Sequence, residues 1–232
     1  MTAPVSGETI IPLRGVRRMI AETMHRSLAE AAQLTHHAEC DVSNLLGVKE
    51  TLAKRGADVS VEDLVIFCTI RTLARHPMMN GLVEQNQIRL LRSVHLGIAI
   101  ALSDDTLVAP AIFDADRKTL EDLANARKAL IARARAGKLT VAEMTGGTFT
   151  VSNLGSSRVR FFTPILNPPQ IAILGVGGIE RRPWVSPEGT IEPRPILGLS
   201  LTFDHRAVDG FPAARFLTDL CRSIDACDAE VH

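Results

Sequence analysis

One short stretch of the sequence, residues 203–210 (FDHRAVDG), places an imidazole among acidic and basic side chains. The residues before it, 196–203, are apolar and rich in β-formers, and residues 211–217 have helical spacing with Pro212 in the first turn. His205 is therefore expected where a strand ends, so that a rigid element can hold its ring facing a cleft. This placement suits a general base, which must lie within hydrogen-bond reach of the proton that it removes.

The length and composition of the chain indicate one domain with a large core. It has 232 residues, of which 46% are hydrophobic and 22% are charged. Because the formal net charge is zero, no overall field would attract nucleic acid or an anionic membrane. The apolar runs are far shorter than the roughly 18 residues of a membrane-spanning helix, and residues 1–8 lack the pattern of a secretory signal. We therefore expect a soluble, cytoplasmic protein that binds neither nucleic acid nor membranes.

Several suggestive groups have simpler explanations than a metal, disulfide or nucleotide site. The chain has four cysteines without CxxC spacing, which is typical of reduced thiols in a core: Cys40, Cys68, Cys221 and Cys227. His36 and His37 lie near Cys40, but adjacent side chains of a strand point to opposite faces, so no metal site is expected there. The glycines of residues 175–178 (GVGG) do not continue into a dinucleotide fingerprint. The Arg and Lys residues of 127–138 are interpreted as a solvated helix face.

Capping signals and apolar periodicity predict the helices. Ser43 is expected to cap one helix, and Ser60 with Asp63 forms a capping box at the start of another. The second of these helices is apolar nearly all round, so we place it at the centre of the fold. A similar box, Thr140 with Glu143, opens a short helix. The longer helices are expected over residues 16–32, 45–55, 61–75, 119–136 and from 210 onward.

Short β-prone runs lie between these helices. They are expected to form strands over residues 35–42, 82–83, 88–91, 96–102, 148–152, 171–176 and 197–203. Strands mixed with unevenly spaced helices are typical of a mixed sheet with helices packed on it. The sequence therefore predicts an α/β protein of the α+β type, built on a mixed central β-sheet.

Six segments follow one another along the chain in an order that indicates a known family. They are RRMIAETM (17–24), GIAI (97–100), GTFTVSNLG (147–155), TPILNPP (163–169), AILG (172–175) and DHRAVDG (204–210). Together they resemble the catalytic domain of the dihydrolipoamide acyltransferase component of 2-oxo acid dehydrogenase complexes. The His-x-x-x-Asp-Gly spacing also resembles the wider superfamily that includes chloramphenicol acetyltransferase. We expect residues 11–232 to form the catalytic domain and residues 1–10 to be a flexible lead-in.

This resemblance implies a homotrimer of chloramphenicol acetyltransferase-like subunits, with each active site in a channel between two subunits. Coenzyme A would enter from one end, and the dihydrolipoyl arm of a lipoyl domain, supplied in trans, from the other. The family's catalytic residues correspond to Ser152, His205 and Asp209, with the serine and the histidine of one site coming from different subunits. Other components of a 2-oxo acid dehydrogenase complex are implied as partners, and no metal is implied.

The chemistry expected of these residues is acyl transfer between two thiols. A thiol with a pKa of about 8.5 is mostly protonated near pH 7, so its attack benefits from a base. We expect neutral His205 to remove the thiol proton during direct attack on the thioester, without an acyl-enzyme, while Ser152 donates its hydroxyl to the oxyanion. Asp209 is expected to fix the loop that carries His205 by pairing with an arginine. The candidate partners are Arg14, Arg17, Arg18 and Arg206.

Departures from the family pattern keep alternatives open. The chain contains no Asp-Lys-Ala lipoylation sequence and no small partner-binding domain, so it is either an excised core or a stand-alone acyltransferase. Residues 102–110 (LSDDTLVAP) replace the Gly-Leu that the family often places before its proline. Residues 221–232 are polar and acidic, which predicts a trimer that does not assemble further or does so weakly. The alternatives are a coenzyme A-dependent transferase with a small-molecule acceptor and a trimeric scaffold without turnover, and the acyl group itself stays open.

Overall fold

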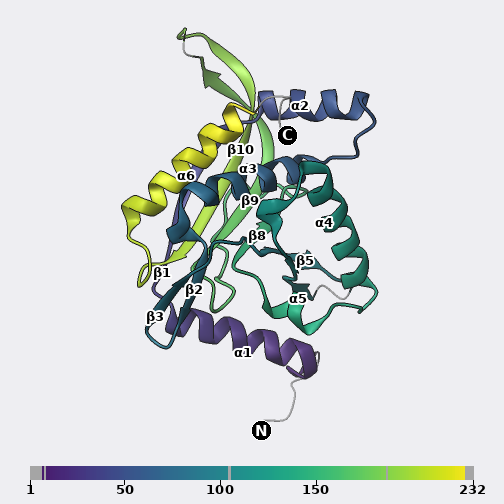
Figure 1. The fold of residues 1–232 in the computed structure, drawn as a ribbon, viewed down its shortest axis with the longest axis vertical. Coiled ribbons are helices and arrows are strands. Elements are labelled where there is room, and N and C mark those ends of the chain that lie inside the picture. Colours follow the sequence, from purple (N-terminus) through teal and green to yellow (C-terminus); the bar gives the residue numbers. More distant parts are fainter. Residues whose placement is uncertain (1–6, 8, 104–105, 187, 228–232) are drawn as a thin grey trace.

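The computed structural model describes residues 7, 9–103, 106–186 and 188–227. The expected lead-in, residues 1–10, lies mostly outside the described residues, as do residues 228–232 at the other end. The centre of the molecule is a six-stranded sheet with the order β1-β10-β9-β8-β4-β7 (Figure 1). Its strands are β1 (Gln33–Asp41), β4 (Leu96–Ile98), β7 (Ala111–Ile112), β8 (Phe149–Asn153), β9 (Ala172–Val185) and β10 (Ile191–Asp204).

Both parallel and antiparallel pairs occur in this sheet, which confirms the predicted mixed architecture. The pairs β8–β9 and β8–β4 are parallel, whereas β1–β10, β10–β9 and β4–β7 are antiparallel. Two small hairpin sheets accompany it, formed by β2 (Gly81–Glu84) with β3 (Gln87–Leu90) and by β5 (Ile100–Ala101) with β6 (Leu107–Val108). The single strand predicted over residues 96–102 is wrong, because the chain leaves the main sheet after β4 and pairs with β6 instead.

Helix α3 lies at the centre of the helical layer, as predicted. Ten of its 15 residues are buried, and it packs against α6, α4 and α2 (Figure 1). The helices are α1 (Gly15–Glu30), α2 (Ser43–Lys54), α3 (Val61–Arg75), α4 (Leu120–Arg135), α5 (Val141–Thr145) and α6 (Gly210–Asp225), with short 3-10 turns at Pro77–Met79 and Ala115–Arg117. Over the described ranges, no helix is both long and apolar enough to cross a bilayer.

The capping predictions were mostly confirmed. Ser60 Oγ accepts from the Asp63 backbone N–H at 3.2 Å, and the Asp63 carboxylate accepts from the Ser60 N–H at 2.8 Å, completing the predicted box. The prediction for Ser43 is wrong, since α2 begins at Ser43 itself. The carboxylate that serves this helix end belongs to Asp41, which accepts from the Ser43 N–H at 2.8 Å.

The prediction of a solvated basic face for residues 127–138 is wrong at Arg127, whereas Arg135 and Lys138 are exposed. The Arg127 side chain is buried and joins α4 to α3 through Asp63, with 2.6 Å between Arg127 Nε and Asp63 Oδ1. A second carboxylate, Glu62, accepts from Arg127 at 2.9 Å. The sequence pattern missed this contact because the acidic partners lie more than 60 residues away along the chain.

The hairpin of β9 and β10 is longer than predicted and extends beyond the helices at the top of Figure 1. Only its buried half has the apolar runs that the sequence analysis used, whereas the outer half alternates between half-buried and exposed residues. Near the middle, Gly177 and Gly198 lie under the loop that follows β8, and a Cβ at either position would overlap the Arg160 carbonyl oxygen. The GVGG run is thus a close-packing feature of β9.

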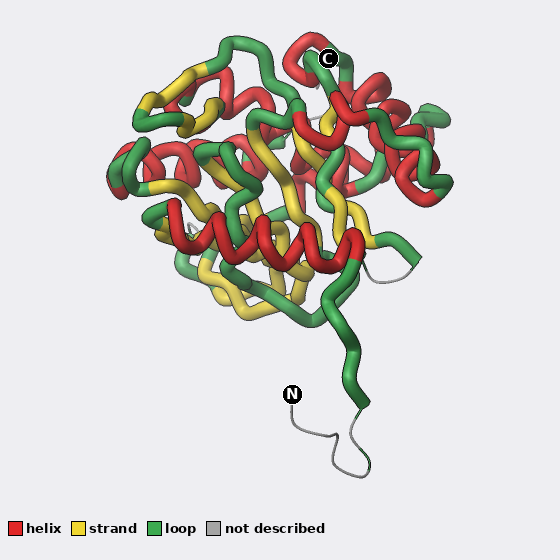
Figure 2. The backbone as a smooth tube through the Cα atoms, turned by 90° about the horizontal axis from the view of Figure 1, so that it is seen from below, coloured by secondary structure: helices red, strands yellow, loops and turns green. Residues whose placement is uncertain are grey.

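Helix α1 is only partly buried. Ser27 is its one fully buried residue among those described. The apolar face expected from Met19, Ile20, Met24 and Leu28 is buried in part, since Ile20 and Met24 are half-buried, whereas Met19 and Leu28 are exposed, at 62% and 56%. The segment that precedes the helix exposes Ile10, Ile11 and Leu13 as well. Figure 2 shows α1 lying across the underside of the molecule, with this segment leading away from it. An apolar helix face without an intramolecular partner is typical of a contact surface between chains.

Candidate active site

The loop that carries His205 is anchored by Asp204, the last residue of β10. The Asp204 side chain is 2% exposed and accepts hydrogen bonds from Arg206 Nε at 3.0 Å and from the second Arg206 guanidinium nitrogen at 2.6 Å. The same carboxylate accepts from the backbone N–H groups of Arg206 and Ala32. The backbone N–H of His205 donates to the Ala32 carbonyl at 2.8 Å. These contacts fix the backbone on both sides of the imidazole.

The charge on Asp204 is stabilised by its partners. Burial by itself would raise the pKa of Asp204, but the hydrogen bonds from Arg206 outweigh it and hold this pKa below its ordinary value. The pKa of Arg206 is raised, chiefly by the hydrogen bond to Asp204. Near neutral pH the two side chains therefore form an ion pair. Arg206 was expected only as one possible partner of Asp209; the signal in the sequence that points to Asp204 is the Asp-x-Arg spacing at a strand end.

His205 is accessible and lies beside Asp209. Its side chain is 42% exposed, and its Nδ1 is 3.7 Å from Asp209 Oδ1. On its inner side the ring contacts the buried Phe203, with 5.9 Å between ring centroids. The distance to Asp209 exceeds a direct hydrogen bond. A carboxylate on this side still favours the tautomer with the proton on Nδ1, which leaves Nε2 as the basic nitrogen.

The arginine expected beside Asp209 does not appear within the described part of this single chain. The ion pair that the structure records for Asp209 joins it to His205, and its side chain is 86% exposed at the N-terminus of α6. Arg206 forms an ion pair with the buried Asp204, and Arg18 forms one with Glu22 on the surface of α1. The predicted pairing of Asp209 with an arginine is therefore not met here.

A second imidazole, His36 of β1, contacts the same phenyl ring as His205, that of Phe203. Its ring makes an edge contact with Phe203 at 5.1 Å between centroids. Burial lowers the pKa of His36, and the nearby His205 and His37 lower it further. His36 is consequently neutral near pH 7 and adds no positive charge beside His205. In the sequence, His36 was interpreted only as a possible metal ligand, and its place next to the candidate base was not predicted.

Ser152 lies elsewhere on the sheet. It belongs to β8 and is in register with Gly175 of β9, which in turn is opposite Ser200 of β10. From Ser200 to His205 the chain advances five residues, or about 16 Å, and two strand spacings add about 10 Å across the sheet, so the two α-carbons are on the order of 19 Å apart. Reacting groups must approach to about 3–3.5 Å. The serine and the histidine of one chain therefore cannot act on the same thioester.

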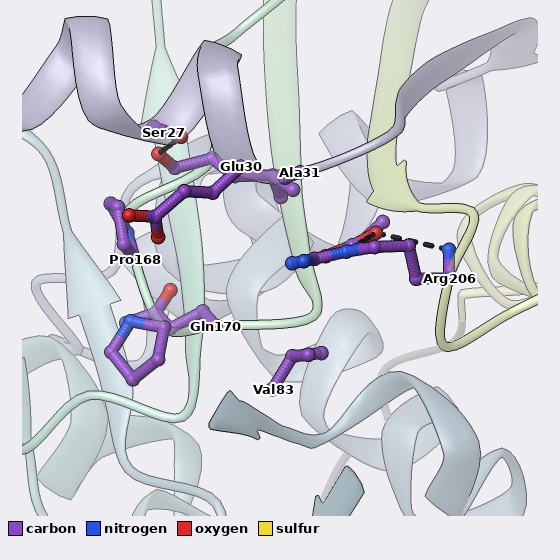
Figure 3. A pocket seen from close by; sticks show the side chains of 10 residues that line it. Ser27, Glu30, Ala31, Val83, Pro168, Gln170 and Arg206 are labelled. Carbon is purple, nitrogen blue, oxygen red and sulfur yellow. Dashed lines mark hydrogen bonds and ion pairs between the residues drawn. The ribbon is translucent and has the colours of Figure 1, made fainter. Parts of the chain in front are cut away.

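A pocket opens beside the loop that carries His205 (Figure 3). Asp204 and Arg206 form one wall, the end of α1 with Ser27 and Glu30 forms another, and the Ser27 hydroxyl donates to the Leu166 carbonyl at 2.7 Å. The remaining lining comes from Ala31, Val83, Leu166, Pro168, Pro169 and Gln170. The pocket thus combines apolar walls with two carboxylates, Glu30 and Asp204, and one guanidinium, Arg206. Among the described residues, no group of three or more His, Cys, Asp or Glu side chains could hold a metal ion.

Comparison with known proteins places this arrangement in context. Residues 5–229 match the family described as 2-oxoacid dehydrogenases acyltransferase (catalytic domain). The chain is 39% identical over 212 residues to the dihydrolipoyllysine-residue acetyltransferase component of the acetoin cleaving system of Bacillus subtilis, covering 89% of this chain and 53% of that protein. It is 34% identical over 231 residues to the lipoamide acyltransferase component of the branched-chain alpha-keto acid dehydrogenase complex of the same organism, covering 97% and 54%. The chain spans about half the length of these relatives.

Solved structures show the same similarity. A probable dihydrolipoamide acetyltransferase from Listeria monocytogenes superposes with a TM-score of 0.91 at 31% identity, covering 98% of this chain and 99% of that one. The dihydrolipoamide acetyltransferase of Azotobacter vinelandii gives 0.87 at 31% identity and 97% of each chain, and the work on that enzyme concerns a serine, a histidine and an asparagine in its catalytic mechanism. Chloramphenicol acetyltransferase gives 0.58 at 14% identity, covering 94% of this chain and 97% of that one, which shows a shared fold alone.

Proposed function

Because the chain belongs to the 2-oxoacid dehydrogenases acyltransferase (catalytic domain) family, we propose that it transfers an acyl group between coenzyme A and a dihydrolipoyl group supplied in trans. The observation that carries the proposal is an accessible imidazole held at a strand end by the ion pair of the buried Asp204 with Arg206. The relatives named above are components of an acetoin cleaving system and of a branched-chain alpha-keto acid dehydrogenase complex. Members of the family therefore transfer different acyl groups, and the acyl group of this chain stays open.

In the proposed reaction, neutral His205 accepts the proton of the incoming thiol at Nε2. The sulfur attacks the thioester carbonyl, a new C–S bond forms, and the carbonyl oxygen becomes an oxyanion that the Ser152 hydroxyl stabilises. Collapse of this intermediate breaks the old C–S bond, and the imidazolium returns its proton to the departing thiolate. Asp209 orients the ring through Nδ1 and stabilises the imidazolium. The spacing supports a place for Asp209 beside the ring, since the asparagine of the Azotobacter enzyme also follows its histidine by four residues; the charge of Asp209 distinguishes this chain from that enzyme.

We further propose that the active protein is a homotrimer in which Ser152 of one subunit meets His205 of the next. Two observations support this arrangement. The separation of about 19 Å within one chain leaves each subunit with half of a site. In addition, the exposed apolar side chains of α1 and the segment before it, including Ile11, Leu13 and Met19, need a partner surface. A cyclic trimer satisfies both requirements, because each subunit offers one half-site to each neighbour.

Complementation between inactive variants tests both proposals. His205→Ala is expected to lower transfer from acetyl-coenzyme A to dihydrolipoamide by a factor of about 10² to 10⁴, and Ser152→Ala by about 10² to 10³. When the two variants are co-expressed with different tags, sites that receive His205 from one chain and Ser152 from the other are intact. Random mixing in a cyclic trimer makes this about a quarter of all sites, so about a quarter of the wild-type rate should return.

The matched control co-expresses His205→Ala with the double variant His205→Ala/Ser152→Ala, which cannot assemble an intact site and should stay inactive. Purified mixed oligomers that remain as inactive as the single variants would refute the shared site. A wild-type protein that is active as a monomer by light scattering would refute it as well. Comparing acetyl, succinyl and branched acyl donors in the same assay identifies the preferred acyl group.

A further inference from the structure

All four cysteines of the chain gather where β1, α3 and α6 meet. Cys40 lies near the end of β1, Cys221 is in the last turns of α6, and their sulfur atoms are 2.9 Å apart. Cys68 of α3 and Cys227, just beyond α6, form a second pair, because a hydrogen bond from Cys227 is the chief cause that lowers the pKa of Cys68. The catalytic proposal uses none of them. Two thiol pairs at the junction of β1, α3 and α6 therefore call for a separate explanation.

The sulfur atoms of the first pair lie close together, 2.9 Å apart. A disulfide has its sulfur atoms about 2.05 Å apart, so Cys40 and Cys221 need to approach by only about 0.9 Å. Cys40 is 1% exposed, whereas Cys221 is half-buried. The hydrogen bond to Cys221 and burial raise the pKa of Cys40, so Cys40 keeps its proton. The pair thus combines a half-buried sulfur with a buried, protonated partner.

We propose that Cys40 and Cys221 form a reversible disulfide site that reacts with hydroperoxides. The Cys221 sulfur gives up its thiol proton and attacks the peroxide, the O–O bond breaks, and Cys221 becomes a sulfenic acid, while the released proton completes the alcohol or water that leaves. The Cys40 sulfur then attacks the sulfenic sulfur. The new S–S bond forms while the S–O bond breaks, and the oxygen leaves as water with the proton of Cys40. A small dithiol reduces this disulfide back to the two thiols by thiol–disulfide exchange.

The expected consequence is a change in stability that leaves the candidate active site in place. The new bond would close a loop between residues 181 positions apart, and long loops give the largest stabilisation in the chain-entropy account. Cys40 pairs with Leu197 of β10, and His205 follows the end of this strand, eight residues further along the chain. These eight residues correspond to about 26 Å along the strand. Because it closes this long loop, oxidation should raise the thermal midpoint by about 5 °C or more. Because of the distance, it should leave the loop that carries His205 in place.

Peptide mapping provides a direct test, because trypsin separates the four cysteines. Cleavage after Lys and Arg places them in residues 27–49, 56–71, 216–222 and 223–232. The full chain is treated with hydrogen peroxide, remaining thiols are blocked with iodoacetamide, and the digest is analysed by mass spectrometry. We expect a linked species of residues 27–49 and 216–222 that disappears after dithiothreitol, and a loss of about 2 Da from the unblocked oxidised chain.

Variants distinguish the two pairs. Cys221→Ser, at a half-buried position that tolerates a hydroxyl, should abolish the linked species and the rise in thermal midpoint. The matched control Cys68→Ser should retain both. The proposal is overturned if wild-type protein gives no such linked species, if the link joins only residues 56–71 and 223–232, or if Cys221 proceeds to the sulfinic acid. Because the wild-type digest decides among these results, the test does not depend on a variant that folds.

Discussion

Replacing Asp204 by Asn tests whether this buried carboxylate holds the candidate base. Asn has nearly the same shape, but its amide nitrogen is a donor and faces the Arg206 guanidinium, which is also a donor. The substitution therefore removes the bonds that Asp204 Oδ2 accepts from Arg206, at 2.6 and 3.0 Å, and the charge that accompanies them. The other oxygen can still accept from the backbone N–H groups. The change is confined to the contact that braces residues 204–206.

The magnitude follows from burial and exposure of the two partners. Hydrogen bonds to charged groups contribute about 1.5–3 kcal/mol. Asp204 is 2% exposed but Arg206 is 44% exposed, so solvent can take over part of the guanidinium's hydration. We expect the variant to lose about 2 kcal/mol of unfolding free energy. For a chain of this length, that loss lowers the thermal midpoint by about 4–8 °C.

Thermal unfolding followed by circular dichroism measures this change, and Glu22→Gln is the matched control. Glu22 also pairs with an arginine, Arg18, but both side chains are more than 60% exposed. That substitution should cost less than about 0.5 kcal/mol. A looser His205 loop should also reduce the kcat of acyl transfer by about 10-fold to 100-fold. If Asp204→Asn unfolds within a degree of the wild type and retains its kcat, the bracing role is wrong.

The pH dependence of the same variant gives an independent check. Because the pKa of Asp204 is lower in the folded state than in the unfolded chain, its stabilising contribution is fully present above the unfolded value of about 3.9. It is lost as the pH falls further and passes through the folded value. The difference in stability between wild type and Asp204→Asn should therefore be constant from about pH 5 to pH 8 and shrink below about pH 4. A difference that grows on acidification would contradict the assigned direction.

Two further predictions concern the framework around the site. Arg127→Met leaves the buried Asp63 without its charge partner and should cost about 3–5 kcal/mol in urea denaturation; a loss below about 1 kcal/mol would show that the pair is dispensable. Gly177→Ala forces the new methyl against the Arg160 carbonyl and should cost about 1–3 kcal/mol. Gly47→Ala, in helix α2 with open space around the new methyl, should instead stabilise by about 0.5–1 kcal/mol; equal effects at the two glycines would refute the packing argument.

The sequence by itself determined the features whose causes are local. The capping box at Ser60 and Asp63 needs residues three apart, so the start of α3 was predictable, and the apolar run before His205 placed this residue at a strand end. The family segments likewise indicated the mixed sheet and the candidate residues. At Ser43 the pattern chose wrongly, because the helix begins one residue earlier and both the hydroxyl and the backbone N–H of Ser43 donate to Asp41.

Tertiary structure alone decided which distant residues meet. Arg127 lies in a helix rich in charged residues, where a solvated side chain is expected, but the fold buries it against Asp63, 64 positions away in the sequence. The gathering of four cysteines and the bracing of Arg206 by a buried carboxylate depend in the same way on how strands and helices pack. Most importantly, strand order and register fix the separation of Ser152 from His205. No periodicity encodes such a distance, because it arises from hydrogen bonds between strands far apart in the chain.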